Sequence, residues 1–181
     1  GAYNQQIIDF GALQCRPRNP DCEGCPLREN CRAYQSGRVA ELPVKQKKKP
    51  RKKRLFNYLH LQFEESCFIE RREGRDIWRK LYQFPLIETA TLPDWQELEK
   101  AARQKAWWKA GDASLLGLSR SYSQTLTHQH IRAVFWKVRL QAPGKALRTE
   151  CREVENHGLH EFAFPRIINC YLADKSLNLS L

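Results

Sequence analysis

Four cysteines lie close together in the stretch CRPRNPDCEGCPLRENC, residues 15–31. The gaps between Cys15, Cys22, Cys25 and Cys31 are six, two and five residues. Thiolates are soft ligands, and four of them suit either zinc or an iron–sulfur cluster. Structural zinc sites usually take ligands from two CxxC-like pairs a dozen or more residues apart, whereas only Cys22 and Cys25 form such a pair here. The spacing therefore favours an iron–sulfur cluster held by one compact loop, with zinc as the alternative.

The cysteine content as a whole does not indicate a disulfide-bonded protein. The chain has seven cysteines, an odd number, and it is not a small secreted chain, so disulfides rank behind both kinds of metal site. Cys67, Cys151 and Cys170 occur singly in apolar surroundings, which predicts buried and unreactive thiols.

Positive charge is concentrated in one segment of the chain. Of 181 residues, 31 are Lys or Arg and 20 are Asp or Glu, which gives a net charge of +11 and favours a polyanionic partner such as nucleic acid. Residues 45–54, KQKKKPRKKR, carry eight of these charges and leave about +3 for the remainder. This run is either a solvated, flexible linker or a direct DNA contact, and it can be both.

The composition also restricts the cellular setting. A 41% hydrophobic content is enough for a packed core. We find no run of eighteen apolar residues and no secretory signal, so we expect no membrane span and a cytoplasmic protein.

The elements that must position the cysteines begin with a helix. Ile7, Ile8, Phe10 and Leu13 recur at helical spacing and predict the end of a helix that belongs to a domain further upstream, so we expect the chain to be a fragment. Residues 1–36 form the first region. Residues 37–54 are predicted to be a basic linker, because Pro50 and dense like charge disfavour regular structure.

Residues 55–181 predict a second domain of the α+β class, with one main sheet. LFNYLHLQF at 55–63 alternates like a strand, and CFIERR at 67–72 follows as the second strand of a hairpin. GRDIWRKLYQFPLIE is expected to be a loop anchored by Trp78, Leu81 and Phe84. Helices are predicted from Asp94 to about 106 and after Pro165, and IRAVFWKVRL at 131–140 predicts the central strand.

The cysteine pattern resembles that of the iron–sulfur DNA glycosylases related to endonuclease III. The resemblance rests on C-x6-C-x2-C-x5-C with CPL at the third cysteine. It implies that Cys15, Cys22, Cys25 and Cys31 ligate a 4Fe-4S cluster. It also implies that the loop RPRNPD presents Arg16 and Arg18 to the DNA backbone; the alternative is that both are solvated loop charges.

Further stretches resemble the adenine glycosylase branch, the MutY family. NQQIIDFGALQC, ELPVK, IWRKLYQFP and TLTHQH carry the resemblance, which spans nearly the whole chain. It implies a Nudix/MutT-like mixed sheet with flanking helices at 55–181, preceded by the end of an all-α helix-hairpin-helix glycosylase domain. The implied activity of the whole protein is removal of adenine mispaired with 8-oxoguanine in double-stranded DNA, during base excision repair.

The resemblance also implies what this chain lacks. The family's catalytic acids would lie upstream of Cys15, so no residue is assigned a catalytic role and the chain alone is expected to be inactive. We expect it to act with that upstream catalytic domain, as a monomer associated with the bacterial nucleoid.

A reader of 8-oxoguanine needs a small polar group at the altered base edge. The family supplies it from a Phe-Ser-His loop, and the matching positions are Leu126, Thr127 and His128. Thr127 keeps the hydroxyl but adds a methyl group, and Leu126 replaces an aromatic wedge. The alternative is that TLTHQH is merely a polar approach to a strand.

Two further functions compete with recognition. A diphosphate hydrolase like MutT needs the metal-binding box GxxxxxEx7REUxEExGU, but LPDWQELEKAARQ offers only scattered Glu97 and Glu99. A zinc-dependent nucleic-acid module without catalysis is the other alternative.

Overall fold

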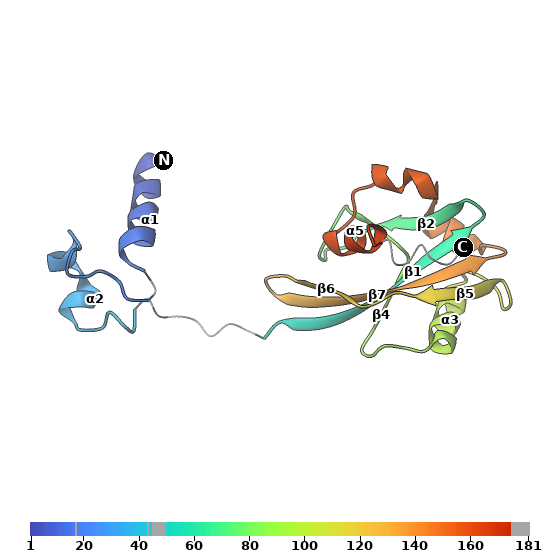
Figure 1. Ribbon diagram of the computed structural model, residues 1–181, viewed down its shortest axis with the longest axis horizontal. Coiled ribbons are helices and arrows are strands. Elements are labelled where there is room, and N and C mark those ends of the chain that lie inside the picture. Colours follow the sequence, from blue (N-terminus) through green and yellow to red (C-terminus); the bar gives the residue numbers. More distant parts are fainter. Residues whose placement is uncertain (17, 43, 45–49, 175–181) are drawn as a thin grey trace. The chain divides into compact units, whose positions relative to one another are not determined.

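The computed structural model describes residues 1–16, 18–42, 44 and 50–174 of the chain. It divides into two compact units, unit 1 (Gly1–Lys48) and unit 2 (Lys49–Leu181), both drawn in Figure 1. The division falls inside the predicted linker. Along the described residues, no helix is long and apolar enough to cross a membrane.

Unit 1 consists of short helical elements and loops. Helix α1 spans Ala2–Gln14, the 3₁₀ turn η1 spans Arg28–Asn30, and α2 spans Arg32–Gln35. The helix predicted from the first apolar residues is confirmed. Its apolar side chains are nevertheless exposed, by 53% at Ile7, 63% at Ile8 and 71% at Leu13, and no described residue of unit 1 is buried.

Unit 2 is built on one mixed sheet, in which neighbouring strands follow the order β3-β2-β1-β7-β5, while β4 pairs with β1, β6 with β7 and β8 with β2. Strands β1 and β7 are parallel, and the other pairs are antiparallel. The strands are β1 (Lys52–Phe63), β2 (Ser66–Arg71), β3 (Tyr82–Gln83), β4 (Leu86–Thr89), β5 (Ala113–Leu118), β6 (Tyr122–Thr125), β7 (Gln129–Leu140) and β8 (Arg152–Glu155). The helical elements are α3 (Trp95–Gln104), α4 (Lys145–Glu150), the 3₁₀ segment η2 (Asn156–Glu161) and α5 (Arg166–Leu172).

Alternation along β1 and β7 produces a core on each face of the sheet. Phe56, Tyr58 and Phe135 pack on the face covered by α5. Leu59 and Trp136 pack on the opposite face, where α3 and α4 supply apolar side chains. Figure 1 shows α5 and α3 on opposite sides of the strands. The predicted α+β class, with a mixed sheet and flanking helices, is confirmed.

The predicted helix after Asp94 is confirmed, and its start has a clear cause. The Asp94 carboxylate accepts a hydrogen bond from Glu97 N at 2.8 Å, while Asp94 N donates to the Glu97 carboxylate at 3.2 Å. This capping box satisfies two backbone N–H groups that a helix start would otherwise leave without partners. The central strand and the helix after Pro165 are also found where predicted.

Two predictions about backbone were wrong. Residues 52–54 were assigned to an irregular linker but form the start of β1, because parallel pairing with β7 from Lys52↔Gln129 onward supplies backbone hydrogen bonds and leaves the Lys side chains exposed. The predicted loop at 74–88 contains the short strands β3 and β4. Its anchor Phe84 is fully buried, as expected.

The single cysteines divide into two kinds. Cys67 and Cys151 are buried, and desolvation raises the pKa of each thiol to about 12, as expected of unreactive thiols. The prediction for Cys170 was wrong, because Cys170 lies on the exposed side of α5, away from the Ile167, Ile168 and Tyr171 face.

Candidate nucleic-acid interface

The four clustered cysteines of unit 1 line one small cavity. Cys15 follows the last residue of α1, and Cys31 immediately precedes α2. Cys25 N donates to Cys22 O at 3.4 Å in the turn between them. Partial loss of solvent, and then repulsion from the other three thiolates, raises the pKa of Cys22. The fold therefore brings the predicted ligands together, although no three His, Cys, Asp or Glu side chains of the described residues are arranged to hold a metal ion.

Hydrogen bonds rather than apolar packing shape the loop around these cysteines. Asp21 Oδ1 accepts from Gly24 N at 3.0 Å, and a Cβ atom at Gly24 would come within 2.7 Å of that carboxylate. The Arg28 guanidinium pairs with Glu23 at 3.0 Å and lies 4.8 Å from the centre of the Tyr34 ring. Asp21 and Gly24 thus shape the turn between Cys22 and Cys25, where a larger residue than glycine would meet the Asp21 carboxylate.

The two predicted backbone-binding arginines are both exposed. Arg16 Nε donates to Leu13 O at 3.0 Å, which directs the side chain back along the end of α1. Arg18 forms no ion pair or side-chain hydrogen bond with the described residues. Both remain accessible to an anion.

The predicted recognition residues form the turn between β6 and β7 in unit 2. Leu126 N donates to Gln129 O at 2.8 Å, so Thr127 and His128 are the two residues at the turn. Both are exposed, whereas Leu126 is half-buried and packs against the core on the α5 face. The hydroxyl and imidazole are free to meet a partner, and Leu126 anchors the turn.

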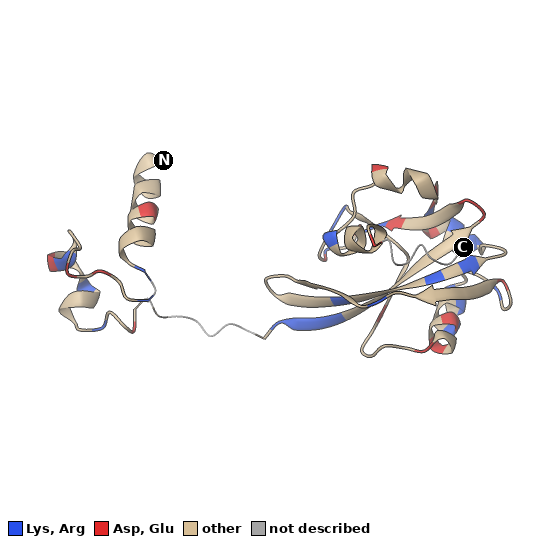
Figure 2. Cartoon of the chain, viewed as in Figure 1, with Lys and Arg blue, Asp and Glu red and all other residues tan. Residues whose placement is uncertain are grey.

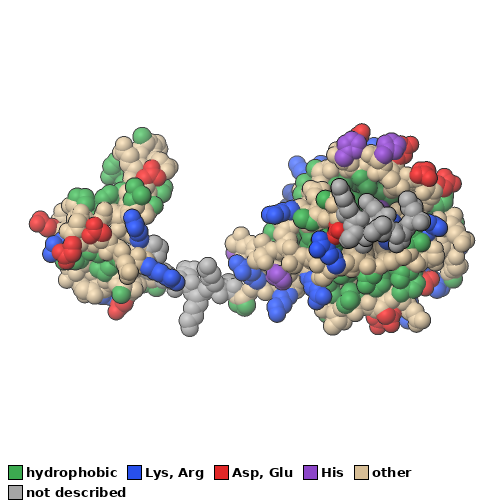
Figure 3. Space-filling view, in the orientation of Figure 1, with side chains coloured by type: hydrophobic (Ala, Val, Ile, Leu, Met, Phe, Trp, Pro, Cys, Tyr) green, Lys and Arg blue, Asp and Glu red, His purple; other side chains and the backbone are tan. Residues whose placement is uncertain are grey.

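The basic start of β1 lies beside this turn. Lys52 N donates to His128 O at 3.0 Å, and Arg51 Nε donates to Thr127 O at 3.4 Å. Lys53 pairs with His130 in the parallel ladder. Figure 2 shows Lys and Arg residues gathered at this end of β1 and β7, and Figure 3 shows basic side chains and a histidine together on its surface. Residues 45–49 of the cationic run lie outside the described residues.

A groove of about 760 Å³ runs along one side of this end of the sheet. Lys53, His130 and Arg132 line one wall, and residues 88–92 line the other. Arg132 is exposed, and its Nε donates to Ser121 Oγ at 2.8 Å. Cations therefore border both the turn and the groove.

Arg54, the next cation along β1, is used differently. Its side chain is 10% exposed and binds Glu88 through two hydrogen bonds of 2.7 and 2.6 Å. It also binds Asp76 at 2.8 and 2.9 Å, and donates to Gln129 Oε1 at 3.0 Å. These hydrogen bonds lower the pKa of the Glu88 carboxyl below its usual range. Arg54 thus links the first residue of β7 to β4 and to the loop after β2, and its guanidinium is engaged by these partners.

This Arg54 network, and the places of His130 and Arg132 beside it, were not predicted from the sequence. Asp76 and Glu88 are 22 and 34 residues from Arg54, so no spacing rule connects them. The sequence did contain one indication of it. Alternate residues of a strand point to the same face, so Arg54 shares the inward-facing side of β1 with Phe56 and Tyr58.

The glutamates offered for diphosphate hydrolysis lie on α3. Glu97 forms the capping box of the helix with Asp94. Glu99 lies on the outer side of α3, next to Lys100 and Arg103. Neither glutamate lies in a group of acidic side chains suited to a metal ion within the part of the chain that the structure describes.

Comparison with known proteins gives relatives over parts of the chain. Residues 57–174, more than half of the chain, match the family described as NUDIX domain. Two proteins named adenine DNA glycosylase, from two subspecies of Buchnera aphidicola, are 36% identical over 89 residues and 40% identical over 86 residues. These matches cover 49% and 46% of this chain but only 26% and 24% of the relatives, so the chain spans about a quarter of their length.

Among solved structures, the complex between the C-terminal domain of mouse MUTYH and human PCNA is similar to this chain, with a TM-score of 0.51. The similarity covers 71% of this chain and 91% of the other, at 13% sequence identity. At that identity the comparison establishes the fold alone.

Proposed function

The chain belongs to the NUDIX domain family, and from that premise we propose that it is the lesion-recognition part of a longer adenine DNA glycosylase. The longer protein would remove adenine paired with 8-oxoguanine in duplex DNA. The activity is proposed for that protein because the relatives are about four times as long as their matched segments. No residue of this chain is assigned to the cleavage of the glycosidic bond.

One observation carries the proposal: an exposed hydroxyl and an exposed imidazole lie at a two-residue turn that is bordered by cations. Thr127 and His128 offer groups that donate and accept hydrogen bonds, which suits the ring N–H and carbonyl that distinguish 8-oxoguanine from guanine. Arg51, Lys52 and Lys53 lie at or just before the start of the adjacent strand β1, where they would neutralise phosphates that flank the base. Base reading and backbone binding would thus be combined on one edge.

The experiment changes the turn in the full-length glycosylase. We expect Thr127→Ala with His128→Ala to reduce the preference for 8-oxoguanine:adenine over guanine:adenine duplexes by about 1 to 3 kcal/mol, the range for one good base-edge contact. Single-turnover adenine release on both duplexes measures it. Ser123→Ala, which removes an exposed hydroxyl from the neighbouring strand β6, is the matched control and should leave the preference unchanged. Equal losses on both duplexes would exclude the turn as the reader.

The cations beside the turn have a separate test. Replacing Arg51, Lys52 and Lys53 by Gln should weaken DNA binding equally with and without the lesion. The slope of log K against log[salt] should fall by about one for each phosphate that is no longer neutralised. A change that depends on the lesion would assign these residues to base reading instead.

We also propose that Cys15, Cys22, Cys25 and Cys31 hold a 4Fe-4S cluster. Four thiols around one cavity are the donor set that such a cluster needs. Only Cys22 and Cys25 form a CxxC pair, so the spacing of the ligands favours a cuboidal cluster over a tetrahedral zinc site built from two such pairs. The cluster would fix the loop that carries Arg16 and Arg18.

Metal analysis tests this assignment. Purified protein should be brown and contain about four iron atoms per chain, as a cuboidal cluster requires. Colourless protein with one zinc ion would favour the zinc-dependent module.

A further inference from the structure

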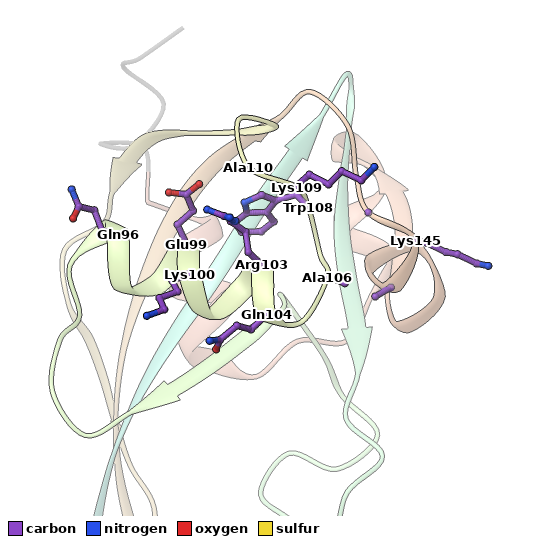
Figure 4. A pocket seen from close by; sticks show the side chains of 12 residues that line it. Gln96, Glu99, Lys100, Arg103, Gln104, Ala106, Trp108, Lys109, Ala110 and Lys145 are labelled. Carbon is purple, nitrogen blue, oxygen red and sulfur yellow. The ribbon is translucent and has the colours of Figure 1, made fainter.

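A second hollow of unit 2 lies against the outer side of α3 and has no role in the function proposed above. Its volume is about 940 Å³. Figure 4 shows that its walls come from three elements: helix α3, the segment after it with Trp108 and Lys109, and the start of α4 with Lys145.

The rim of this hollow carries four cations. Lys100 and Arg103 belong to α3, and Lys109 and Lys145 belong to the other two elements. In the described part of the chain, none of the four forms an ion pair or donates a side-chain hydrogen bond. The lining contains a single carboxylate, that of Glu99. The rim therefore has a net positive charge without internal neutralisation.

The lining of the hollow includes a buried donor that also lacks a partner. Trp108 is 2% exposed, and its indole Nε1–H has no acceptor among the described residues. Its two neighbours in the same core differ: Trp107 Nε1 donates to Glu150 at 3.1 Å, and Trp136 Nε1 donates to Asn57 at 3.3 Å. A buried N–H is normally paired, so Trp108 differs from both neighbouring tryptophans in this respect.

The backbone holds the walls of the hollow in place. Gly144 N, at the start of α4, donates to Trp107 O at 2.7 Å. A Cβ atom at Gly144 would lie 2.3 Å from Ala106 O, so only glycine allows this approach. The segment before Trp108 and the residue before Lys145 are thus fixed against each other, and the cations are carried by a defined scaffold.

We propose that this hollow binds phosphate groups. Lys and Arg from three elements supply the charge and the hydrogen-bond donors that a phosphate needs. The hollow is larger than a single phosphate needs, which suits either a free polyphosphate or successive phosphates of a nucleic-acid backbone. Binding there is independent of the turn at Thr127 and of the lesion.

The test uses the complete chain and the indole N–H resonances of its five tryptophans. Titration with pyrophosphate should shift the Trp108 resonance, which Trp108→Phe identifies by its disappearance. Lys100→Glu with Arg103→Glu should weaken binding at least about tenfold, since each charge-assisted hydrogen bond is worth about that factor or more. Arg139→Glu is the matched control. Arg139 is exposed, and because side chains alternate along β7, it points to the face of the sheet away from α3 and the hollow.

A short undamaged duplex distinguishes the two sources of phosphate. If it shifts Trp108, and the two charge reversals abolish that shift, the site takes the nucleic-acid backbone. If only pyrophosphate acts, the site takes a free phosphate compound. The proposal is overturned if neither probe shifts Trp108, or if Arg139→Glu weakens binding as much as the paired reversals do.

Discussion

Unit 1 and unit 2 differ in where their apolar side chains lie. In unit 1, Ile7, Ile8 and Leu13 are exposed and no described residue is buried. In unit 2, both faces of the sheet are covered, and side chains such as Phe56 and Leu59 are completely buried. Each such burial contributes about 1.5 to 3 kcal/mol. Unit 2 can therefore be stabilised by its own core, whereas unit 1 needs bonds to a bound group or contacts with further protein, as small units usually do.

The largest effect is expected from removing one proposed cluster ligand. Cys25→Ser should abolish iron binding and the order of unit 1, because metal binding in comparable structural sites contributes about 10 kcal/mol or more, and unit 1 has no core to replace it. Iron content and the amide spectrum of unit 1 measure the effect, while unit 2 should melt unchanged. Cys170→Ser, on the exposed side of α5, is the control. If unit 1 stayed ordered without iron, the idea that it depends on a bound cluster while unit 2 depends on its core would be wrong.

The corresponding change in unit 2 is Phe135→Ala. Phe135 is fully buried and stacks on Tyr171, with ring centroids 3.9 Å apart. We expect the free energy of unfolding of unit 2 to fall by about 3 to 5 kcal/mol, with the iron content unchanged. Denaturant unfolding measures it. Tyr3→Ala, at a 73% exposed side chain of α1, should cost less than about 0.5 kcal/mol.

The core of unit 2 should also make its stability depend on pH. His60 is 9% exposed and stacks on Phe84, and burial, followed by the charge of Lys137, lowers its pKa to about 3. Between pH 6.5 and about 3, the unfolded chain binds a proton that the folded chain excludes, so stability is lost as the pH falls through that range. The loss should be about 2 to 4 kcal/mol between about pH 7 and pH 4.

Unfolding curves at several pH values measure the slope that His60 causes. His60→Gln should flatten this slope, whatever it does to the stability at neutral pH. An unchanged slope in the variant would assign the acid sensitivity to other groups.

The smallest effect is expected at the Arg54 network. Glu88→Gln removes one charge from a pair whose arginine is 10% exposed, so we expect a loss of about 1 kcal/mol. Glu73→Gln is the matched control, because Glu73 pairs with Arg71 at 3.5 Å while both side chains are about half exposed or more, and its loss should be close to zero. Thermal unfolding compares the two. Equal losses of stability in the two variants would mean that the low exposure of Arg54 does not strengthen its ion pair with Glu88.

The sequence by itself determined the elements whose patterns are local. The apolar run at 131–140 predicted the central strand, Asp94 marked the start of α3, and the cysteine spacing identified the four residues that line one cavity. These features depend on alternation, capping and short sequence separation, which can be read without knowing any neighbour.

Only the tertiary structure decided what depends on distant partners. Lys52 and Lys53 are in a strand because β7, about 77 residues later, offers them a parallel ladder. Cys170 is exposed because α5 turns another face toward the sheet, and the Arg54 side chain is only 10% exposed because Asp76 and Glu88 meet it from two other segments. The turn at Thr127 likewise came to lie beside the basic strand through pairing across the sheet. Such contacts are formed by the packing of the whole unit, so no local pattern in the sequence records them.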